Sequence, residues 1–346
     1  MAVTPAPRLR LGELSVNFAG LLGQALGASG YAPQALLESF GLTPQRLAEP
    51  GARLSIPRYM RLGHAAIGLA GEPALGLRMG ELCRLPVAGL AGVAAAQAPT
   101  LGEAARTLLR FEPLYASNYR GHSHLAEDAE GAWLWFYSIA PYNRFNRFVV
   151  DSLLSGWLHQ LGALVGAPLV AEQLLIEFPA PGYAPAYAPL CQQPVRFEAP
   201  GNGVRLSKQQ MALPNPAHCP GTWQQLLQLC ETELEQLTRG RRLSERVVAL
   251  LGPMLSGGRE PDLESLAARL KMPSWTLRRK LAEEGVGFRE LLNDTRRDLA
   301  LAYIRDTELA FGEIAYLLGF ASAEAFARAF KRWSGETPGC VRKARR

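Results

Sequence analysis

An internal repeat in the last third of the chain limits the possible folds more than any other feature of the sequence. Residues 262–285 and 311–335 align at an offset of 48 and, after one extra turn residue, at an offset of 49. Each copy has the pattern of a short helix, a tight turn and a second helix. The matched pairs are Leu266/Ile314, Ala267/Ala315, Leu270/Leu318, Met272/Phe320, Leu277/Phe326, Arg279/Arg328 and Leu281/Phe330.

The repeated unit has the features of a helix-turn-helix. An alanine in each first helix, Ala267 or Ala315, lets the two helices approach closely, and an apolar turn residue, Met272 or Phe320, fills their junction. In such a unit the second helix presents its N-terminal residues to a DNA major groove. The segment between the copies, 288–306, predicts a helix about 30 Å long. A rod of that length can hold two such helices about one DNA turn, roughly 34 Å, apart.

The charge of the chain is divided unevenly along its length. From Gly240 to the end there are 20 Lys and Arg against 14 Asp and Glu, whereas residues 1–239 carry 17 of each. Three basic clusters, 278–280, 296–297 and 331–332, lie inside helical patterns. This asymmetry indicates a polyanion-binding module attached to an electrically neutral one.

The first part of the chain predicts a mixed α+β domain. Helical patterns fill about the first hundred residues, and a β-hairpin is expected around Gly131. A helix follows near 147–165, then a strand near 169–178 and a second hairpin around 201–203. We therefore expect an α+β effector-binding or dimerisation domain over 1–213, a linker and connector helix over 214–240, and an all-α DNA-binding domain over 241–346 with two helix-turn-helix units joined by a long helix.

Several other classes of protein are disfavoured by the sequence. No apolar run is long enough to span a membrane, and the N-terminal segment lacks a convincing secretory pattern, so we expect a cytoplasmic protein. The five cysteines are odd in number and form no C-x-x-C pair, and no zinc-binding motif is present, so neither a disulfide framework nor a metal or other cofactor is expected. No nucleophile elbow, P-loop or dinucleotide motif occurs, which argues against an enzyme.

At the level of motifs, 262–342 resembles the DNA-binding domain of AraC/XylS-family transcription regulators. The segments EIAYLLGF and AFARAFKRWSGETPGCVR carry that resemblance. Less sharply, the preceding 210 residues resemble the arabinose-binding-type N-terminal domain of a subgroup that includes ornithine-utilisation regulators, through LLIEFPAP and PVRFEAP. The sequence departs from the family pattern at Ala310, where relatives often place a capping Ser or Thr.

The resemblance implies which residues of the first unit face DNA. Its recognition helix corresponds to Ser274–Glu284, with Ser274, Trp275, Arg278 and Arg279 facing the groove. An arginine paired with guanine through two hydrogen bonds is the contact that we expect to discriminate most between bases. Thr276 and Lys280 are expected to meet phosphates, which position a protein without specifying sequence. Trp275 is expected to pack on a thymine methyl or a sugar, or to be an ordinary surface tryptophan.

In the second unit Ser322 is a suitable N-cap for the recognition helix. That helix presents a chemically poor set of side chains, so we expect it to contribute mainly backbone anchoring through Arg328 and Lys331. The full set of residues predicted to contact DNA is Ser274, Trp275, Thr276, Arg278, Arg279, Lys280, Arg296, Ser322, Ala323, Glu324, Ala327, Arg328 and Lys331.

A neutral domain joined to a DNA reader suggests a sensor. In the family such domains bind a small effector, dimerise, or both, and the chain then activates transcription by contacting RNA polymerase. The alternative is a domain that only dimerises or binds a protein partner, or, for the whole chain, an architectural DNA binder without sequence preference. The candidate effector-binding residues, which equally suit a sheet core, are Tyr119, Trp133, Trp135, Tyr137, Tyr142, Arg144 and Arg147.

Overall fold

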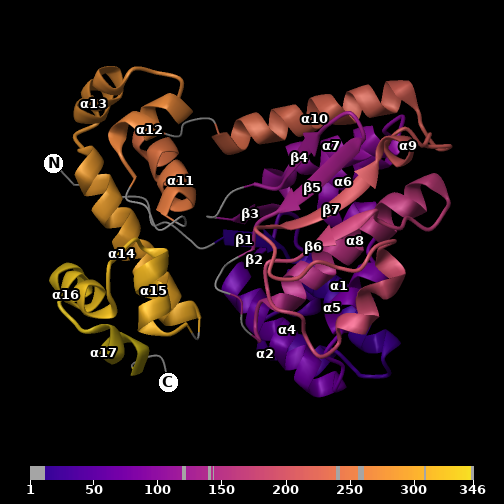
Figure 1. The fold of residues 1–346 in the computed structure, drawn as a ribbon, viewed down its shortest axis with the longest axis horizontal. Helices are drawn as coiled ribbons and strands as arrows, with labels where there is room; N and C mark the ends of the chain where they lie inside the picture. Colours follow the sequence, from indigo (N-terminus) through magenta and orange to yellow (C-terminus); the bar gives the residue numbers. More distant parts are fainter. Residues whose placement is uncertain are drawn as a thin grey trace. The chain divides into compact units, whose positions relative to one another are not determined.

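The computed structural model describes residues 12–118, 122–138, 142, 144–238, 242–255, 261–307 and 309–343. The chain divides into two compact units, one formed by Glu13–Asn118 and His122–Leu237 and the other mainly by the chain after Leu237. The first unit is α+β and the second is all-helical (Figure 1). The predicted fold class is thus confirmed.

Helices make up most of the N-terminal unit. They are α1 (Asn17–Ala28), α2 (Gln34–Ser39), α3 (Pro44–Ala48), α4 (Ile56–Ala70), α5 (Leu75–Glu81), α6 (Gly89–Ala96), α7 (Leu101–Arg110), α8 (Arg147–Val165), α9 (Lys208–Met211) and α10 (Pro220–Thr238). Three short 3-10 helices, η1 (Leu85–Ala88), η2 (Glu112–Leu114) and η3 (Ala184–Leu190), complete this set for the described residues. Helix α10 covers the predicted connector, but Cys230 on it is buried and Trp223 packs against the core of this unit.

Two antiparallel sheets complete the unit. The smaller has the order β2-β1-β3 and the larger β4-β5-β7-β6. Strands β4 and β5 form the predicted hairpin, whereas the predicted second hairpin around 201–203 is wrong. Its second arm is β7, which enters the sheet between β5 and β6. Its first arm instead bonds to the chain in and after β6, with an isolated parallel bridge from Arg196 to Leu175. The strands are β1 (Gly12–Ser15), β2 (Arg53–Ser55), β3 (Ala116–Asn118), β4 (His124–Glu127), β5 (Gly131–Phe136), β6 (Gln173–Leu175) and β7 (Asn202–Ser207).

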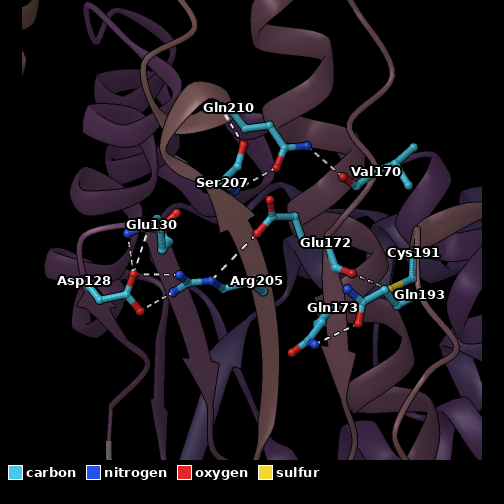
Figure 2. Close-up of polar contacts among 11 residues, drawn as sticks. Asp128, Glu130, Val170, Glu172, Gln173, Cys191, Gln193, Arg205, Ser207 and Gln210 are labelled. Carbon is cyan, nitrogen blue, oxygen red and sulfur yellow. Dashed lines mark hydrogen bonds and ion pairs between the residues drawn. The ribbon is translucent and has the colours of Figure 1, made fainter.

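An ion-pair network fixes the register of the larger sheet on its outer side. Arg205 on β7 donates to both carboxylate oxygens of Asp128, at 2.6 and 2.8 Å, and its Nε lies 3.9 Å from a Glu172 oxygen (Figure 2). The Arg205 guanidinium lowers the pKa of Asp128 to about 2. Because Asp128 follows β4 and Glu172 precedes β6, the network joins the β4-β5 turn, β7 and the approach to β6.

The core of the unit is centred on α8, which packs closely against α5. A methyl group added at Gly80 would lie 2.4 Å from Ser155 Cβ, and one at Gly76 would lie 2.8 Å from the Phe148 carbonyl oxygen. Only glycine permits helices to approach this closely. Among the described residues α8 is the single unbroken helix that is long and apolar enough to cross a membrane, but 61% of its most apolar window is buried within the protein. It is the core helix of this unit.

A buried carboxylate anchors η3 to α8. Asp151 is fully buried and accepts hydrogen bonds from Tyr183 (2.7 Å) and from Tyr187. Burial raises the pKa of Asp151 to about 7, and the two tyrosine hydroxyls oppose that rise. The interaction holds a proline-rich loop of the sequence against the longest core helix.

The second unit consists of seven helices in the described residues. They are α11 (Leu243–Leu255), α12 (Leu263–Arg269), α13 (Ser274–Glu283), α14 (Phe288–Asp306), α15 (Phe311–Leu317), α16 (Ala323–Ser334) and α17 (Pro338–Lys343). Helix α14 runs between two helix pairs, α12-α13 and α15-α16 (Figure 1). Leu299, Ala300 and Tyr303 of α14 are fully buried, so this helix is a central part of the core as well as a connector.

We predict that Asp151→Asn removes a pH dependence from the stability of the N-terminal unit. The folded-state pKa of Asp151 is raised from its ordinary 3.8 to about 7, so the folded state binds more protons in this window. Wild-type stability relative to the variant must therefore fall as pH rises from about 4 to about 7. Urea unfolding at several pH values measures that difference.

Asp128→Asn is the matched control, because the pKa of Asp128 is lowered to about 2. Its difference from wild type should stay constant between pH 5 and 7 and change only below about pH 4. A difference between wild type and Asp151→Asn that is flat from pH 4 to 7 would contradict the burial argument.

Candidate functional site

The first helix-turn-helix unit is built from α12 and α13. Asp262 caps α12 by accepting from the Ser265 backbone N–H at 2.7 Å. The chain then turns through Lys271, whose φ of 53° lies in the left-handed region, and the Met272 N–H donates to the Ala267 carbonyl at 3.1 Å. Leu277 and Leu281 bury the inner face of α13. The opposite face of α13 is consequently free to meet a partner.

The outer face of α13 carries an exposed aromatic and basic cluster. Trp275 is 65% exposed, and Arg278, Arg279 and Lys280 are exposed beside it. The Arg279 guanidinium carbon lies 5.9 Å from the centre of the Trp275 ring, and Arg279 Nε lies 3.5 Å from a carboxylate oxygen of Glu283. These two contacts hold the guanidinium between Trp275 and Glu283 on the outer face of the helix.

The remaining residues predicted on α13 occupy different surroundings. Ser274 and Thr276 are half-buried. Arg278 shares a surface groove with Asp262, Glu264 and Arg289, where acidic and basic side chains alternate. Arg279 does not line that groove. The two neighbouring arginines therefore lie in different electrostatic environments.

The second unit, α15 and α16, repeats the first turn closely. The Phe320 N–H donates to the Ala315 carbonyl at 2.9 Å, which corresponds to the Met272–Ala267 bond. Gly319, with a φ of 73°, takes the left-handed turn position that Lys271 takes in the first unit. The repeat predicted from sequence is thus present as two equivalent backbone turns.

Helix α16 begins as predicted and presents a sparse outer face. Ser322 accepts from the Ala325 N–H at 3.2 Å, which confirms the predicted N-cap. Glu324, Arg328 and Lys331 are exposed, while Ala323 and Ala327 are half-buried. A hydrogen bond from Ser322, together with Arg328, lowers the pKa of Glu324. The face thus carries one negative charge, at its N-terminal end, beside its basic residues.

Arg296 is a correction to the predicted DNA-contacting set. Its side chain is buried, its Nε donates to the Leu318 carbonyl at 3.1 Å, and its guanidinium carbon lies 5.5 Å from the Phe320 ring centre. These contacts tie the turn of the second unit to α14. A guanidinium committed to an interior carbonyl and ring is not available to a phosphate, so we remove Arg296 from the set.

The start of α15 is held in a way that the sequence analysis missed. Ala310 offers no side-chain cap, but the Glu313 carboxylate accepts from the Ala310 N–H at 2.6 Å. This is the reciprocal half of a capping box. The weakness expected from Ala310 is thus compensated within the first turn of the helix.

An enclosed pocket lies within the N-terminal unit. Its described lining comes from α1, α4, α5, α7, α8, the first sheet and the end of β5, and it includes Phe18, Glu112, Phe136, Trp157 and Gln160. The enclosed space is about 910 Å³ when the gaps between atoms and its open mouth are included. A mostly apolar lining with a few polar side chains is typical of small-molecule sites.

None of the described residues predicted to bind an effector lines this pocket. Side chains alternate along β5, so Trp133 and Trp135 lie on the face opposite Phe136, which reaches the pocket. The two tryptophan rings stack at 5.1 Å and pack beside Gly203, where an added methyl group would come within 3.0 Å of Trp135. Tyr137 stacks on His124 on the same side.

The other predicted pocket residues have structural partners or lie outside the description. The Tyr142 hydroxyl bonds to Glu177, Arg147 lies over the Phe178 ring at 5.5 Å, and Arg144 lies over Phe145 at 5.0 Å. Tyr119 lies outside the described residues. Phe136 lines the pocket but was not among the predicted residues, although it lies in the predicted hairpin. The alternation of side chains along the strand is the sequence signal that places Phe136 and the two tryptophans on opposite faces.

No metal site emerges from the part of the chain that the structure describes. Within it no group of three or more His, Cys, Asp or Glu side chains is arranged to hold an ion.

Comparison with known proteins identifies both units. Residues 30–215 match the family described as the arabinose-binding domain of AraC transcription regulators, and 266–344 match a helix-turn-helix domain family. The ornithine utilization regulator of Pseudomonas aeruginosa is 31% identical over 329 residues, which cover 95% of this chain and 96% of that protein. The regulator VirS of Mycobacterium tuberculosis is 38% identical over 106 residues, 31% of each chain.

Among solved structures, the regulator CdpR of Pseudomonas aeruginosa covers 93% of this chain and 98% of its own, with 24% identity and a TM-score of 0.41. The two family matches and the full-length relative settle the classification. The chain belongs to the AraC family of DNA-binding transcription regulators, in the group that carries an arabinose-binding-type N-terminal domain.

Proposed function

We propose that this regulator is an effector-responsive transcriptional activator that reads DNA mainly with its first recognition helix. The observation that carries the proposal is the exposed pair of Trp275 and Arg279 on α13, which has no equivalent on α16. An exposed arginine can donate two hydrogen bonds to a guanine, and an exposed indole can pack on a thymine methyl or a sugar. On α16, Arg328 and Lys331 serve mainly to anchor phosphates.

The enclosed pocket favours an effector over the alternative that the N-terminal unit only dimerises. A dimerisation surface has no need for an interior cavity with its own buried polar groups. We also propose that the chain acts as a homodimer in the cytoplasm and contacts RNA polymerase at its promoters, and that it has no catalytic activity of its own.

Two measurements test this function. Selection of bound sites from a random DNA library should give a motif with two blocks about one DNA turn apart. Transcription with purified RNA polymerase from a promoter carrying that motif should then increase when the protein is added. A lack of any enriched motif would refute sequence reading, and reduced transcription would refute activation.

We predict that Arg279→Ala weakens binding to the selected site by about 1 to 3 kcal/mol and relaxes the preference at one base position. Lys331→Ala is the matched control on the second unit, where a phosphate contact should weaken all sequences similarly and reduce the salt dependence. Fluorescence anisotropy with the selected site and with random DNA measures both variants. Equal losses on the two DNAs for Arg279→Ala would rule out base reading by Arg279.

We predict that Arg296→Ala destabilises the helical unit without removing a phosphate contact. The substitution leaves the buried Leu318 carbonyl without its donor, which costs about 1 to 3 kcal/mol. Thermal unfolding should therefore begin at a lower temperature. Below that temperature, the slope of DNA affinity against salt concentration should match wild type, whereas a slope reduced by about one unit would restore Arg296 to the DNA-contacting set.

A further inference from the structure

The pocket of the N-terminal unit holds little charge with which to bind a charged ligand. Among its described lining residues, Glu112 is the single carboxylate, and none is Lys, Arg, His or Asp. A ligand carboxylate or phosphate would therefore enter without a cation to receive it. Burying such a group without a partner is costly, so anionic ligands are disfavoured.

Glu112 itself is already occupied by the protein. One of its carboxylate oxygens accepts from the Ser123 hydroxyl at 2.6 Å, and the other accepts from the Ser123 N–H at 2.7 Å. Burial raises the pKa of Glu112 to about 7, so a full negative charge is disfavoured there. A ligand ammonium would have to share a carboxyl group that already accepts two hydrogen bonds from Ser123 and is only partly ionised near pH 7, so cationic ligands are disfavoured as well.

The other polar lining groups are mostly directed at the protein. The Tyr59 hydroxyl donates to the Met79 sulfur at 3.5 Å, and the Tyr115 hydroxyl donates to the Leu108 carbonyl at 3.2 Å. Their rings thus face the pocket while their oxygens are satisfied. Phe136 and Trp157 add an edge-to-face aromatic pair, with ring centres 6.4 Å apart.

Gln160 differs from these two tyrosines in its hydrogen bonding. Its side chain is more than nine-tenths buried, and its one hydrogen bond is from Cys83 Sγ to its Oε1 at 3.8 Å. Within the described part of the chain its Nε2 group donates to no acceptor. A buried amide with unused N–H groups at the wall of an apolar pocket is suited to an acceptor that a ligand brings.

We propose that this pocket binds a neutral, largely apolar molecule and that Gln160 donates a hydrogen bond to an oxygen of that molecule. The inference rests on the proposed effector function and specifies the class of ligand. It excludes as occupants both a zwitterionic amino acid such as ornithine and a sugar such as arabinose. A sugar would have to bury several hydroxyl groups against a lining that is mostly apolar, which is costly.

The full-length protein and the neutral fluorescent probe N-phenyl-1-naphthylamine provide the test. The probe should bind saturably, and four competitors of similar length should separate by chemistry: 2-nonanone, 1-nonene, nonanoate and nonylamine. We expect 2-nonanone to displace the probe at concentrations about tenfold lower than nonanoate or nonylamine. L-Ornithine and L-arabinose should not displace it.

Three variants connect this result to the pocket. Val149→Trp places a large ring in the lining and should abolish saturable probe binding, whereas Ala163→Trp, at an exposed position of the same helix, should retain it. Gln160→Leu should reduce the preference for 2-nonanone over 1-nonene by about fivefold, the contribution of one hydrogen bond. Circular dichroism of each variant establishes that it is folded.

The proposal fails if nonanoate, nonylamine, ornithine or arabinose competes as well as 2-nonanone, if Val149→Trp folds and still binds the probe, or if Gln160→Leu leaves the ketone preference unchanged. Probe binding is measured without DNA, and motif selection is measured without ligand. A failure of the ligand class is thus distinguishable from a failure of DNA reading, because each experiment can succeed while the other fails.

Discussion

The tight turn inside each helix-turn-helix unit is the constraint on which the DNA-reading surface depends. A single backbone hydrogen bond, from Met272 to Ala267 in the first unit and from Phe320 to Ala315 in the second, fixes the second helix against the first. The turn closes for two reasons. The first helix has an alanine where the helices cross, and one residue of each turn, Lys271 or Gly319, adopts the left-handed conformation. With the geometry set by the backbone, the outer residues of α13 and α16 can differ completely without changing how either helix is held.

The N-terminal unit solves a different physical problem, since it must surround a cavity without collapsing into it. Glycines at the α5–α8 contact allow these helices to pack closely, while Asp151 pins the proline-rich η3 segment to α8. On the outer side of the larger sheet, Arg205 joins segments that are far apart in the sequence. Rigid packing around the pocket means that a ligand meets a largely pre-formed wall, which reduces the entropy lost on binding.

Local signals were readable from the sequence, and contacts between distant residues were not. The helix at 288–306 and the cap at Ser322 were predicted correctly because periodicity and capping involve neighbouring residues. Arg296 was misassigned because its partner carbonyl lies 22 residues later, and adjacent charges suggested a surface position. The segment 201–203 has the composition of a hairpin turn, yet Asn202 and Gly203 lie within β7, which pairs with β5, about 70 residues earlier. Alternation along β5 separated the tryptophans from Phe136, but only the tertiary fold determines which face adjoins the pocket.

The charged side chains of the two units differ in their exposure to water, and this difference explains why the units use charge differently. On α13, Arg279 is exposed and its ion pair with Glu283 is open to water, so exchanging that carboxylate for a guanine edge costs little. Binding is less favourable at a DNA site that has no hydrogen-bond acceptor within reach of the guanidinium. There Arg279 either remains paired with Glu283 or loses that partner without gaining another. An acidic neighbour can thereby lower affinity for non-cognate DNA more than for the cognate site.

In the pocket, by contrast, Glu112 is shielded from water and held by Ser123, and no comparable exchange is available to a charged ligand. Exposure to water therefore makes charge the expected basis of discrimination at the proposed DNA-reading face. In the pocket we expect shape and hydrogen bonding to neutral groups such as the Gln160 amide to discriminate instead.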